Sequence, residues 1–543
     1  MTDRTLALNP AVDGFGARDP SAVLFVDGAL AAGVEEGRLA RRKHAPGTFP
    51  RRAVAACLDR ADLSLGDVDR VAVPWRPGGS RHRAEFRDGD KDPVDLAPVR
   101  ERLAAFGPVP PVEAYNHHRS HAASAFRPSG FDRALVVTVD GRGAHDATVV
   151  WEGTGDGLRR VATYDPPNSL GHLYAATAGY LGHGAFGGEG KVMGLAAYGE
   201  ADAAVARRLR GAIDPGVDYD VTGLVGGGVP SGVSRLASLL DRPRGRAATP
   251  ADPGKANLAR AVQSFLEATV VDLVETYCDR LRVDAVCLAG GVALNCKLNR
   301  AVAASPAVDR LFVQPVASDA GAPVGAGLLA TGGRLDPATV YWGPSFGDER
   351  IVRLLDRRGV GYERPADLAG RVADLLADGA VVGWFQGRLE MGPRALGNRS
   401  ILADPRSERT RDRVNAFVKR REAWRPLAPS LPAAAAEDYL RPATPAPYMV
   451  RAVDVPPERR RTIPAAVHPA DGTARPQTVT EAQNPRYHRL LRAFEARTGV
   501  PALVNTSFND RGDPIAATPE AALETFRATG IDALALGGCL ITS

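Results

Sequence analysis

Short apolar runs alternate with amphipathic stretches in the first part of the chain, a pattern that predicts strands interleaved with helices. The runs of strand length are residues 5–8, 22–26, 29–35, 71–73, 134–140 and 148–151. Asp27-Gly28 and Asp140-Gly141 each lie between two of these runs, and such dipeptides are typical of hairpin turns. Because two segments each open with a strand, a glycine turn and a returning strand, the sequence predicts a duplicated unit.

The later part of the chain resumes this alternation after a stretch rich in glycine and proline. That stretch, residues 214–253, has no clear period and is predicted to be a loop insertion over a cleft. The remaining predicted elements are helices at 50–61, 256–280, 368–378, 410–417 and 519–528, and strands at 285–289, 311–313, 381–385 and 502–505. Residues 331–347 are predicted to be a linker. We therefore expect an α/β protein with domains at residues 1–340 and 341–543, the first built like the actin- and sugar-kinase-like ATPases.

Composition excludes several classes of protein. A length of 543 residues exceeds what one hydrophobic core usually serves. The formal charge of +5 is small for this size, which argues against a nucleic-acid partner. The five cysteines form no CxxC pair, so neither a disulfide framework nor a zinc finger is indicated. Without a signal-like N-terminus or an apolar run of membrane-spanning length, we expect a cytoplasmic protein with no membrane partner.

One short segment carries the pattern of a metal site. His117 and His121 are four residues apart, so on a helix both imidazoles project from one face, one turn apart. Asp140 and Asp319 each follow an apolar strand and add carboxylates. Two imidazoles with carboxylates suit iron(II), zinc or manganese. Other interpretations remain open, because helical histidine pairs also occur as surface or core residues and Asp319 also fits a helix N-cap.

The second predicted domain is rich in groups that bind anions. Its loops combine glycine and proline with cationic side chains, which favours fixed turns that present guanidinium groups to phosphate. These cations are Arg388, Arg394, Arg399, Lys419, Arg421, Arg425 and Arg475. Asn505 and Ser507 follow an apolar strand, where α/β sheets usually bind ligands. A basic surface is the alternative explanation for the cations.

These motifs, taken in order, resemble those of the O-carbamoyltransferases of antibiotic biosynthesis, the tobramycin carbamoyltransferase and nodulation-protein U family. The resemblance extends almost from end to end of the chain. In the first domain it includes Lys43-His44, the His117/His121 pair, Val139-Asp140-Gly141, Gly190-Lys191, Ala289-Gly290-Gly291 with Asn295, and Pro315-Val-Ala-Ser-Asp319. In the second it includes Gly392-Pro-Arg-Ala-Leu-Gly397, Arg425-Pro-Leu-Ala-Pro429, Asn484-Pro-Arg-Tyr-His488 and Asn505-Thr-Ser-Phe-Asn509.

The resemblance implies a two-step enzyme. A C-terminal YrdC-like domain would make carbamoyl adenylate from carbamoyl phosphate and ATP, with Mg²⁺, through Arg394, Lys419, Arg425, Arg475, Asn505 and Ser507. An N-terminal Kae-like domain would transfer the carbamoyl group to a hydroxyl of a small natural product, as in antibiotic tailoring, and AMP and pyrophosphate would be released. There the resemblance implies iron(II), or another divalent metal, on His117, His121, Asp140 and Asp319. It also places Lys191, Gly290, Gly291 and Asn295 near the nucleotide.

The chain departs from this family where the acceptor hydroxyl is activated. Family members commonly carry His-Asp in the first hairpin, and here the stretch reads Ala17-Arg18-Asp19-Pro20. A guanidinium cannot serve as a general base at neutral pH. Arg18, Asp19 and Lys43 are therefore predicted at the catalytic centre. The role of the base is left to Asp19, to another group such as His44 or His172, or to the substrate's own environment. Residues 75–90 are predicted to shape the acceptor pocket.

Two other functions remain open at this stage. One is a threonylcarbamoyl-tRNA or hydrogenase-maturation enzyme, which the absence of CxxC modules and the modest charge disfavour. The other is a nucleotide-binding protein with decayed chemistry, which the change at Arg18 would explain. The identity of the acceptor is not specified by the sequence, and a homodimer is left open.

Overall fold

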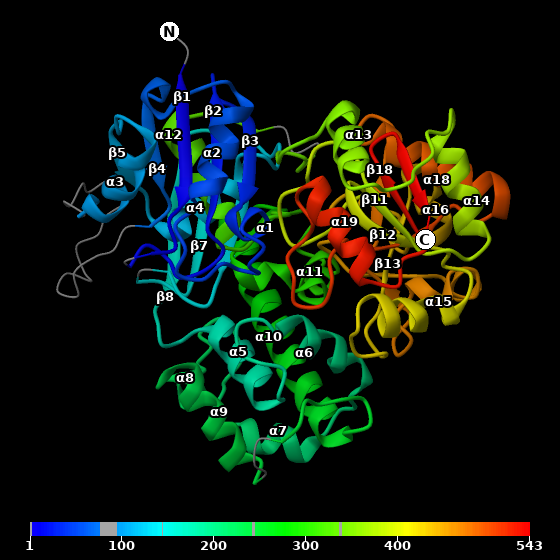
Figure 1. Cartoon of the computed structure of the whole chain (residues 1–543). Coiled ribbons are helices and arrows are strands. Elements are labelled where there is room, and N and C mark those ends of the chain that lie inside the picture. The colour runs from blue at the N-terminus through cyan, green and yellow to red at the C-terminus, as the bar shows by residue number, and fades with distance from the viewer. Residues whose placement is uncertain are drawn as a thin grey trace.

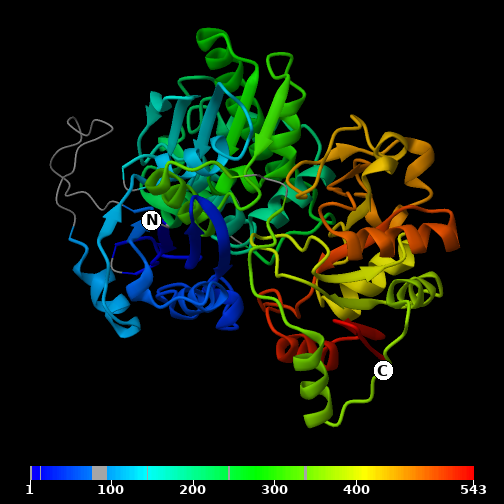
Figure 2. The same ribbon diagram turned by 90° about the horizontal axis from the view of Figure 1, so that it is seen from above.

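The computed structural model describes residues 3–12, 14–75, 95–143, 145–241, 245–335 and 339–542. The predicted acceptor loop therefore lies outside the described residues from residue 76 onward. The chain forms two neighbouring sheets in its first part and a separate mixed sheet in its last part, with a group of helices beside them (Figures 1 and 2). No helix in the described part of the chain is long and apolar enough to cross a membrane.

The first two sheets have the same topology. One sheet has the order β3-β2-β1-β4-β5 and the other the order β8-β7-β6-β9-β10. In each, three strands form an antiparallel meander and the next two run parallel to its first strand. The strands are β1 (Arg4–Asn9), β2 (Ser21–Val26), β3 (Ala29–Glu35), β4 (Arg70–Val73), β5 (Val112–Ala114), β6 (Ala134–Val139), β7 (Thr148–Thr154), β8 (Gly157–Tyr164), β9 (Ala285–Ala289) and β10 (Arg310–Val313). The predicted duplication is thereby confirmed.

Two helices pack against each other between these sheets. α12 (Ala322–Thr331) lies on β1 and β2, and α4 (His117–Phe126) lies on β6 and β9. Glycine makes the contact possible, because a Cβ at Gly325 would lie 1.7 Å from the Ser120 carbonyl oxygen. A Cβ at Gly327 would lie 2.2 Å from the Phe25 ring. The close approach fixes α4 relative to the start of α12.

The part of the sequence between β8 and β9 forms a group of helices. Its members are α5 (Leu170–Tyr180), α6 (Glu189–Leu195), α7 (Ala203–Leu209), α8 (Thr222–Val225), α9 (Gly228–Leu239) and α10 (Pro253–Leu281). The prediction of a loop insertion at residues 214–253 was wrong, because α8 and α9 lie inside it. Val229 and Leu236 of α9 are buried, and Pro230 lies in its first turn, where no helical hydrogen bond is lost. A Cβ at Gly232 would lie 2.8 Å from that of Ala176, so this glycine permits close helix packing.

The last part of the chain forms a mixed sheet between two helical layers. Its strand order is β16-β13-β17-β12-β11-β18-β19. The strands are β11 (Val382–Phe385), β12 (Arg399–Ala403), β13 (Ala428–Pro432), β16 (Gln477–Val479), β17 (Leu503–Ser507), β18 (Ala533–Leu536) and β19 (Cys539–Thr542). Trp384 packs toward α14 (Leu368–Ala377) and α18 (Pro485–Thr498), whereas Phe385 packs toward α13 (Asp348–Arg357) and α19 (Pro519–Ala528). Adjacent residues thus face opposite layers. The predicted α/β class is confirmed.

Polar contacts join the first part of the chain to the last. The Arg38 guanidinium donates to the carbonyl oxygens of Glu390 and Gly392. The Lys297 ammonium pairs with Asp471. Lys191, on α6, forms an ion pair of 2.8 Å with Glu422. These contacts hold the loops of the last part against the first.

Candidate active site

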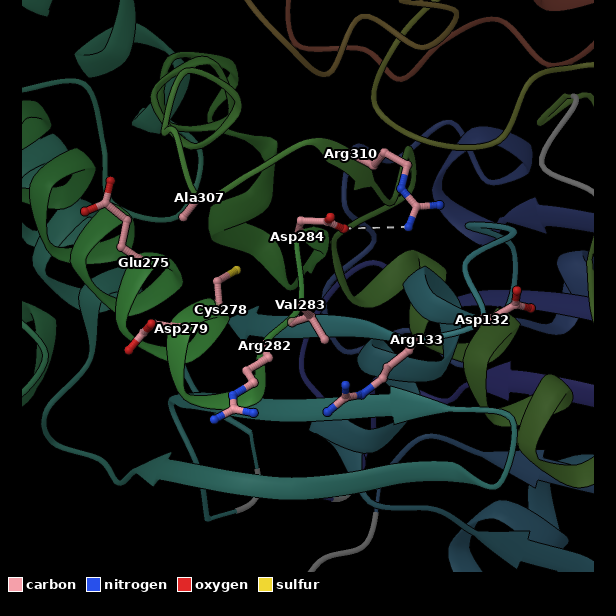
Figure 3. A pocket seen from close by; sticks show the side chains of 10 residues that line it. All are labelled: Asp132, Arg133, Glu275, Cys278, Asp279, Arg282, Val283, Asp284, Ala307 and Arg310. Atoms are coloured by element: carbon pink, nitrogen blue, oxygen red, sulfur yellow. Dashed lines mark ion pairs between the residues drawn. The ribbon is translucent and has the colours of Figure 1, made fainter.

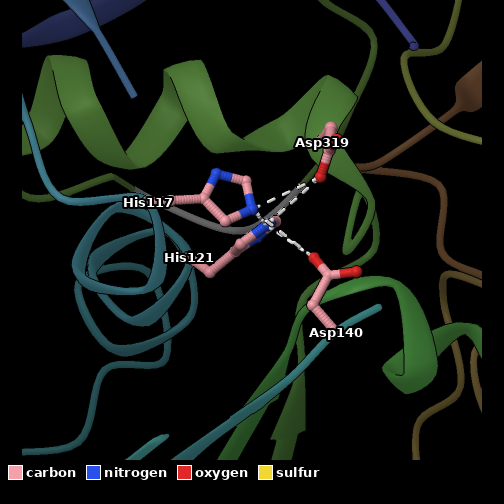
Figure 4. Close-up of side chains that lie close together, drawn as sticks. All are labelled: His117, His121, Asp140 and Asp319. Carbon is pink, nitrogen blue, oxygen red and sulfur yellow. Dashed lines mark hydrogen bonds and ion pairs between the residues drawn. The ribbon is translucent and has the colours of Figure 1, made fainter. Parts of the chain in front are cut away.

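The four predicted metal ligands converge at the carboxyl ends of parallel strands. α4 begins at His117, and its N-cap residue Asn116 accepts the Arg119 amide hydrogen. His117 and His121 are both buried and project from one face toward Asp140, which follows β6, and Asp319, which precedes α12 (Figure 4). Residues from three separated segments therefore meet at one point.

The spacing of the ligand atoms fits a single metal ion. The Nε2 atom of His121 lies 3.2 Å from Nε2 of His117, 3.2 Å from Oδ2 of Asp140 and 3.6 Å from Oδ1 of Asp319. The Nε2 atom of His117 lies 3.6 Å and 3.5 Å from the same two oxygens. Two ligands each about 2.1 Å from one metal are roughly 3.0–3.4 Å apart at octahedral or tetrahedral angles. Two of the five separations lie in this range and the other three exceed it by 0.1–0.2 Å, so small shifts of the carboxylates would let the donor set hold a divalent cation.

The charge of the site also favours a cation. Burial opposes protonation of His121, but the Asp140 and Asp319 carboxylates outweigh it and raise the pKa of this imidazole to about 9. Burial acts to raise the pKa of Asp140, and hydrogen bonds from His117 and His121 lower it well below its usual range. The carboxylates packed beside the two imidazoles favour positive charge at this point, which a divalent metal supplies.

The surroundings of His117 fix which ring nitrogen faces the cluster. Its Nδ1–H donates to the Pro74 carbonyl oxygen at 3.2 Å, which leaves the lone pair of Nε2 for a metal. The Trp75 indole stacks on the ring with centroids 3.8 Å apart. His118 is not part of the site, since its ring is hydrogen bonded to Thr138 and to the Asp146 carbonyl oxygen.

Cations of the last part of the chain gather into a second centre. Burial, and then the Arg475 charge, lower the pKa of Arg394 to about 9. Burial, and then Arg425 and Arg475, lower the pKa of Arg421 to about 9. These groups stay protonated at neutral pH but repel one another. Because a free energy cost of this kind is recovered when an anion binds, the cluster is suited to phosphate groups.

Lys419 lies at the centre of these cations. It is 5% exposed, and its ammonium donates to the carbonyl oxygens of Ser507 and Asn509, both at 2.8 Å, and to Oδ1 of Asn509 at 2.7 Å. Burial and the charges of Arg421 and Arg425 lower its pKa well below the usual range. Ser507, the last residue of β17, therefore lies in this centre, as its position at the end of an apolar strand predicts.

Two arginines of the predicted anion site do not join it. Arg399 is buried and donates to the carbonyl oxygens of Gln386 and Asn398. Arg388 donates to those of Gly343 and Ala31. Their guanidinium groups are used to satisfy backbone oxygens around the loops, so the sequence prediction for these two was wrong.

Asn505 and Asn295 hold the local fold. Asn505 is buried, and its amide donates to Oγ of Ser430 and Oε1 of Gln477. Asn295 caps α11 (Cys296–Ala303) and exchanges hydrogen bonds with Gln263. The hydrogen bonds of both side chains therefore stabilise the backbone beside the loops of the site.

The paired glycines lie against the metal cluster. Gly290 has φ +89°, and a Cβ there would lie 2.3 Å from the Val139 carbonyl oxygen. A Cβ at Gly291 would lie 3.1 Å from Oδ1 of Asp140. Glycine is required at Gly290 by its positive φ and its close approach to the end of β6, whereas the contact at Gly291 is only tight; the turn leaves backbone beside the carboxylate.

The first hairpin brings the remaining predicted residues to the same region. Asp19 and His44 are joined by a hydrogen bond of 2.7 Å between Oδ1 and Nδ1. The Arg18 guanidinium lies 5.9 Å from the centre of the Phe186 ring. Burial, and then the charges of Arg425 and Lys191, lower the pKa of Lys43. Lys43 therefore lies where the hairpin faces the second centre.

Sequence reasoning missed Glu422 and Phe186, and it placed Trp75 in the acceptor loop without its contact to His117. Trp75 follows β4, so its place after a parallel strand was an available signal. Burial acts to raise the pKa of Glu422, but the ammonium of Lys191 and the charge of Arg425 outweigh it and hold the pKa at about 2. Nothing in the sequence marks Glu422 as the counter-ion of the cluster, because its partner lies far away in the chain.

Replacing Glu422 with glutamine is expected to lower the free energy of unfolding by about 1 kcal/mol at pH 7. The carboxylate has a folded pKa of about 2, below the ordinary 4.5, so its stabilisation is present above about pH 4.5. It is lost as pH falls toward 2. Urea unfolding at pH 7, 5 and 4 checks this; a difference between variant and wild type that grows as pH falls would contradict it.

A cavity of about 640 Å³ lies at the ends of β6 and β9 that are opposite the metal cluster (Figure 3). It is lined by Asp132, Arg133, Glu275, Cys278, Asp279, Arg282, Val283, Asp284, Ala307 and Arg310. Arg133 and Asp284 immediately precede β6 and β9, whereas Asp140 and Gly290 follow them. The cavity is therefore separate from both centres.

Comparison with known proteins extends over nearly the whole chain. Residues 99–328 match the family model described as carbamoyltransferase N-terminus, and residues 373–543 match that described as carbamoyltransferase C-terminus. Nodulation protein NolNO of Sinorhizobium fredii is 39% identical over 96% of this chain and 78% of its own length. Nodulation protein U of Bradyrhizobium diazoefficiens is 28% identical over 90% of this chain and 91% of its own.

Matches to solved structures are more distant. Component A of the Acidaminococcus fermentans (R)-2-hydroxyglutaryl-CoA dehydratase covers 61% of this chain and 98% of its own, with 15% identity and a TM-score of 0.37. HypF of T. kodakarensis covers 61% of this chain and 48% of its own, with 16% identity and a TM-score of 0.35.

Proposed function

This chain belongs to the carbamoyltransferase family, and we propose that it is an ATP-dependent O-carbamoyltransferase acting on a small natural product. It would first hydrolyse carbamoyl phosphate with one water molecule to carbamate and inorganic phosphate. A carbamate oxygen would then attack the α-phosphate of ATP, which gives carbamoyl adenylate and releases pyrophosphate. A hydroxyl of the acceptor would then take the carbamoyl group and AMP would leave. The observation that carries the proposal is the presence of two distinct centres, a cation cluster and a candidate metal cluster.

The cation cluster supports the first step. Carbamoyl phosphate and ATP together bring several negative charges, which Lys419, Arg394 and Arg425 are placed to offset. The half-exposed arginines can reach a ligand while Lys419 is held in place by Ser507 and Asn509. Fixed cations aimed at charge that develops on a leaving phosphate supply the largest electrostatic contribution in many such reactions.

The metal cluster supports the second step. A divalent metal, iron(II) by analogy with the family, would act as a Lewis acid toward phosphate oxygens when bound by His117, His121, Asp140 and Asp319. Neighbouring residues orient the His117 ligand. The Pro74 carbonyl oxygen fixes the tautomer of its ring, and Trp75 stacks on one face of that ring. The turn at Gly290 and Gly291 brings backbone without side chains close to Asp140, where a nucleotide would bind in this proposal.

Lys43 lies near the cation cluster. Its pKa is lowered by burial, by Arg425 and by Lys191, and Asp19 and Arg18 also act on it. It therefore lies between the cation cluster and the hairpin. An adenylate formed at Lys419, in the proposed domain of residues 341–543, would pass toward the metal cluster in the proposed domain of residues 1–340. It would remain near positive charge on the way. Passage inside the protein would protect it from water.

The proposal is tested with the purified wild-type protein. Labelled pyrophosphate is expected to exchange into ATP when carbamoyl phosphate and Mg²⁺ are both present, because formation of the adenylate is reversible. Bicarbonate in place of carbamoyl phosphate serves as the control and should give no exchange. ADP as the nucleotide product, or exchange that is independent of carbamoyl phosphate, would contradict the proposed first step.

A further inference from the structure

The hairpin that departs from the family's sequence holds an imidazole–carboxylate pair built from two segments. Oδ1 of Asp19 and Nδ1 of His44 lie 2.7 Å apart, and the Asp19 amide donates to the His44 carbonyl oxygen at 3.0 Å. The side chains are 25% and 35% exposed, respectively. The pair is thus ordered on one side and open to solvent on the other.

Backbone strain accompanies this pair. Asp19 has φ +53° and His44 has φ +59°, and Arg41 and Ala45 have φ +55° and +30°. A side chain in the left-handed region costs on the order of 1 kcal/mol or more, and such residues cluster where function requires a fixed geometry. Neither Asp19 nor His44 is glycine, so the strain accompanies the specific side chains that meet.

Hydrogen bonds tie the pair to the candidate metal cluster. The amide of Asn9, at the end of β1, donates to the carbonyl oxygens of Arg18 and Asp19 at 2.9 and 3.0 Å. Oδ1 of Asn9 accepts from Nε1 of Trp75 at 2.9 Å, and Trp75 stacks on His117. The hairpin is therefore linked to a metal ligand through two side chains.

A second link ties the same hairpin to the other side of the cluster. Oγ of Ser21 donates to the Ala320 carbonyl oxygen at 2.8 Å, and Ala320 follows the predicted ligand Asp319. The hairpin carrying Asp19 is thus held against both His117 and Asp319. His44, which is hydrogen bonded to Asp19, is thus tied through this hairpin to the candidate metal cluster.

The geometry points to His44 as the general base of carbamoyl transfer, with Asp19 as its positioning residue; this rests on the proposed function. The Asp19 carboxylate accepts a hydrogen bond from Nδ1–H, which leaves the lone pair on Nε2. As the acceptor oxygen bonds to the carbamoyl carbon, its proton passes to Nε2 of His44. The bond from that carbon to the phosphate oxygen breaks, and AMP leaves with the electron pair. The imidazolium then loses its proton to water.

The other histidine near this region lacks such an orienting group. His172 lies near Gly141 and meets the edge of the Phe186 ring, with centroids 6.3 Å apart. Within the described residues its ring has no hydrogen bond or ion pair. A base works best when a second group fixes its tautomer and orientation, as the pair of Asp19 and His44 does. Arg18 stands in the hairpin where family members commonly carry histidine. His44, in a later loop, therefore supplies the imidazole.

The test compares nucleophiles that differ in their need for a base. Enzyme, ATP and carbamoyl phosphate are incubated with glycerol, a hydroxyl that must lose its proton, or with hydroxylamine, whose nitrogen is already nucleophilic. His44→Asn and Asp19→Asn are expected to lower formation of glycerol carbamate, by about 10²-fold for His44→Asn. Formation of hydroxyurea should stay within about twofold of wild type, as should pyrophosphate exchange. His488→Asn, on α18, is the matched control for loss of an imidazole.

A second variant distinguishes loss of the base from misfolding of the protein. His44→Gly is expected to regain transfer to glycerol when imidazole is added, and His44→Asn, which cannot admit imidazole as well, should respond less. Wild-type transfer by His44→Asn would overturn the proposal, as would loss of transfer in His172→Asn alone. Equal loss with glycerol and hydroxylamine, or a wild type that makes hydroxyurea but no glycerol carbamate, would also overturn it. Failure of pyrophosphate exchange in the wild type would instead contradict the proposed function.

Discussion

Replacing Lys419 with methionine is expected to lower pyrophosphate exchange dependent on carbamoyl phosphate by about 10³-fold. The Lys419 ammonium is buried among cations and is anchored by Ser507 and Asn509, so its position is fixed before any substrate binds. A fixed charge stabilises a developing phosphate charge without reorganisation. Methionine keeps the length of the side chain and removes only the charge and the donors.

The same substitution should leave the fold intact. Arg421 and Arg425 lower the pKa of Lys419, so removal of its charge relieves repulsion, which offsets the lost hydrogen bonds. Thermal unfolding is expected within a few degrees of wild type. Lys255→Met is the control, because that ammonium donates to the Arg246 carbonyl oxygen at the surface. A folded Lys419→Met protein with normal exchange would contradict the role of the cluster in the first step.

Much of the fold follows from local sequence pattern. Apolar runs of strand length predicted β1, β2 and β9 to within a residue or two, and Asp27-Gly28 gave the first hairpin. The loop prediction at residues 214–253 failed because glycine and proline obscured a helical period. Gly232 is there for close packing against Ala176, a contact that only the folded chain reveals.

The metal cluster was predictable because its ligands obey local rules. His117 and His121 share a helix face, and Asp140 and Asp319 follow strands whose ends meet at one edge of the folded sheets. The cation cluster was predictable only in part, since Arg399 directly follows the same glycine- and proline-containing loop that carries Arg394. Whether a guanidinium faces a ligand or a carbonyl oxygen depends on backbone groups far away in the sequence.

The pairing of Asp19 with His44 shows a further limit of sequence patterns. Asp19, His44 and His172 were equivalent as candidate bases, because each was simply a titratable side chain near the family's motifs. The distinction arises from the left-handed backbone at Asp19 and His44 and from the hydrogen bond between their side chains. Both are long-range outcomes of how the hairpin meets the loop after α1 (Glu36–Leu39).

Replacing Asp140 with asparagine is expected to remove tightly bound metal and to lower carbamoyl transfer by about 10³-fold, while pyrophosphate exchange persists. Asp140 faces both histidines, with Oδ2 3.2 Å from His121 and 3.6 Å from His117, so it contributes both a ligand and negative charge. The amide keeps the shape of the side chain but loses its charge. The cation cluster, which carries the first step, is left unchanged.

Metal content and transfer to hydroxylamine are the measurements for the Asp140 variant. Wild type and variant are stripped with chelator and reloaded without oxygen with iron(II), zinc or manganese. Asp272→Asn, on the outer side of α10, is the matched control for loss of a carboxylate. Asp140 and the His44 base act on different atoms. Asp140→Asn should therefore slow carbamoyl transfer to hydroxylamine and to glycerol alike, whereas His44→Asn should slow only transfer to glycerol. An Asp140→Asn protein that binds metal and transfers normally would exclude this cluster from the second step.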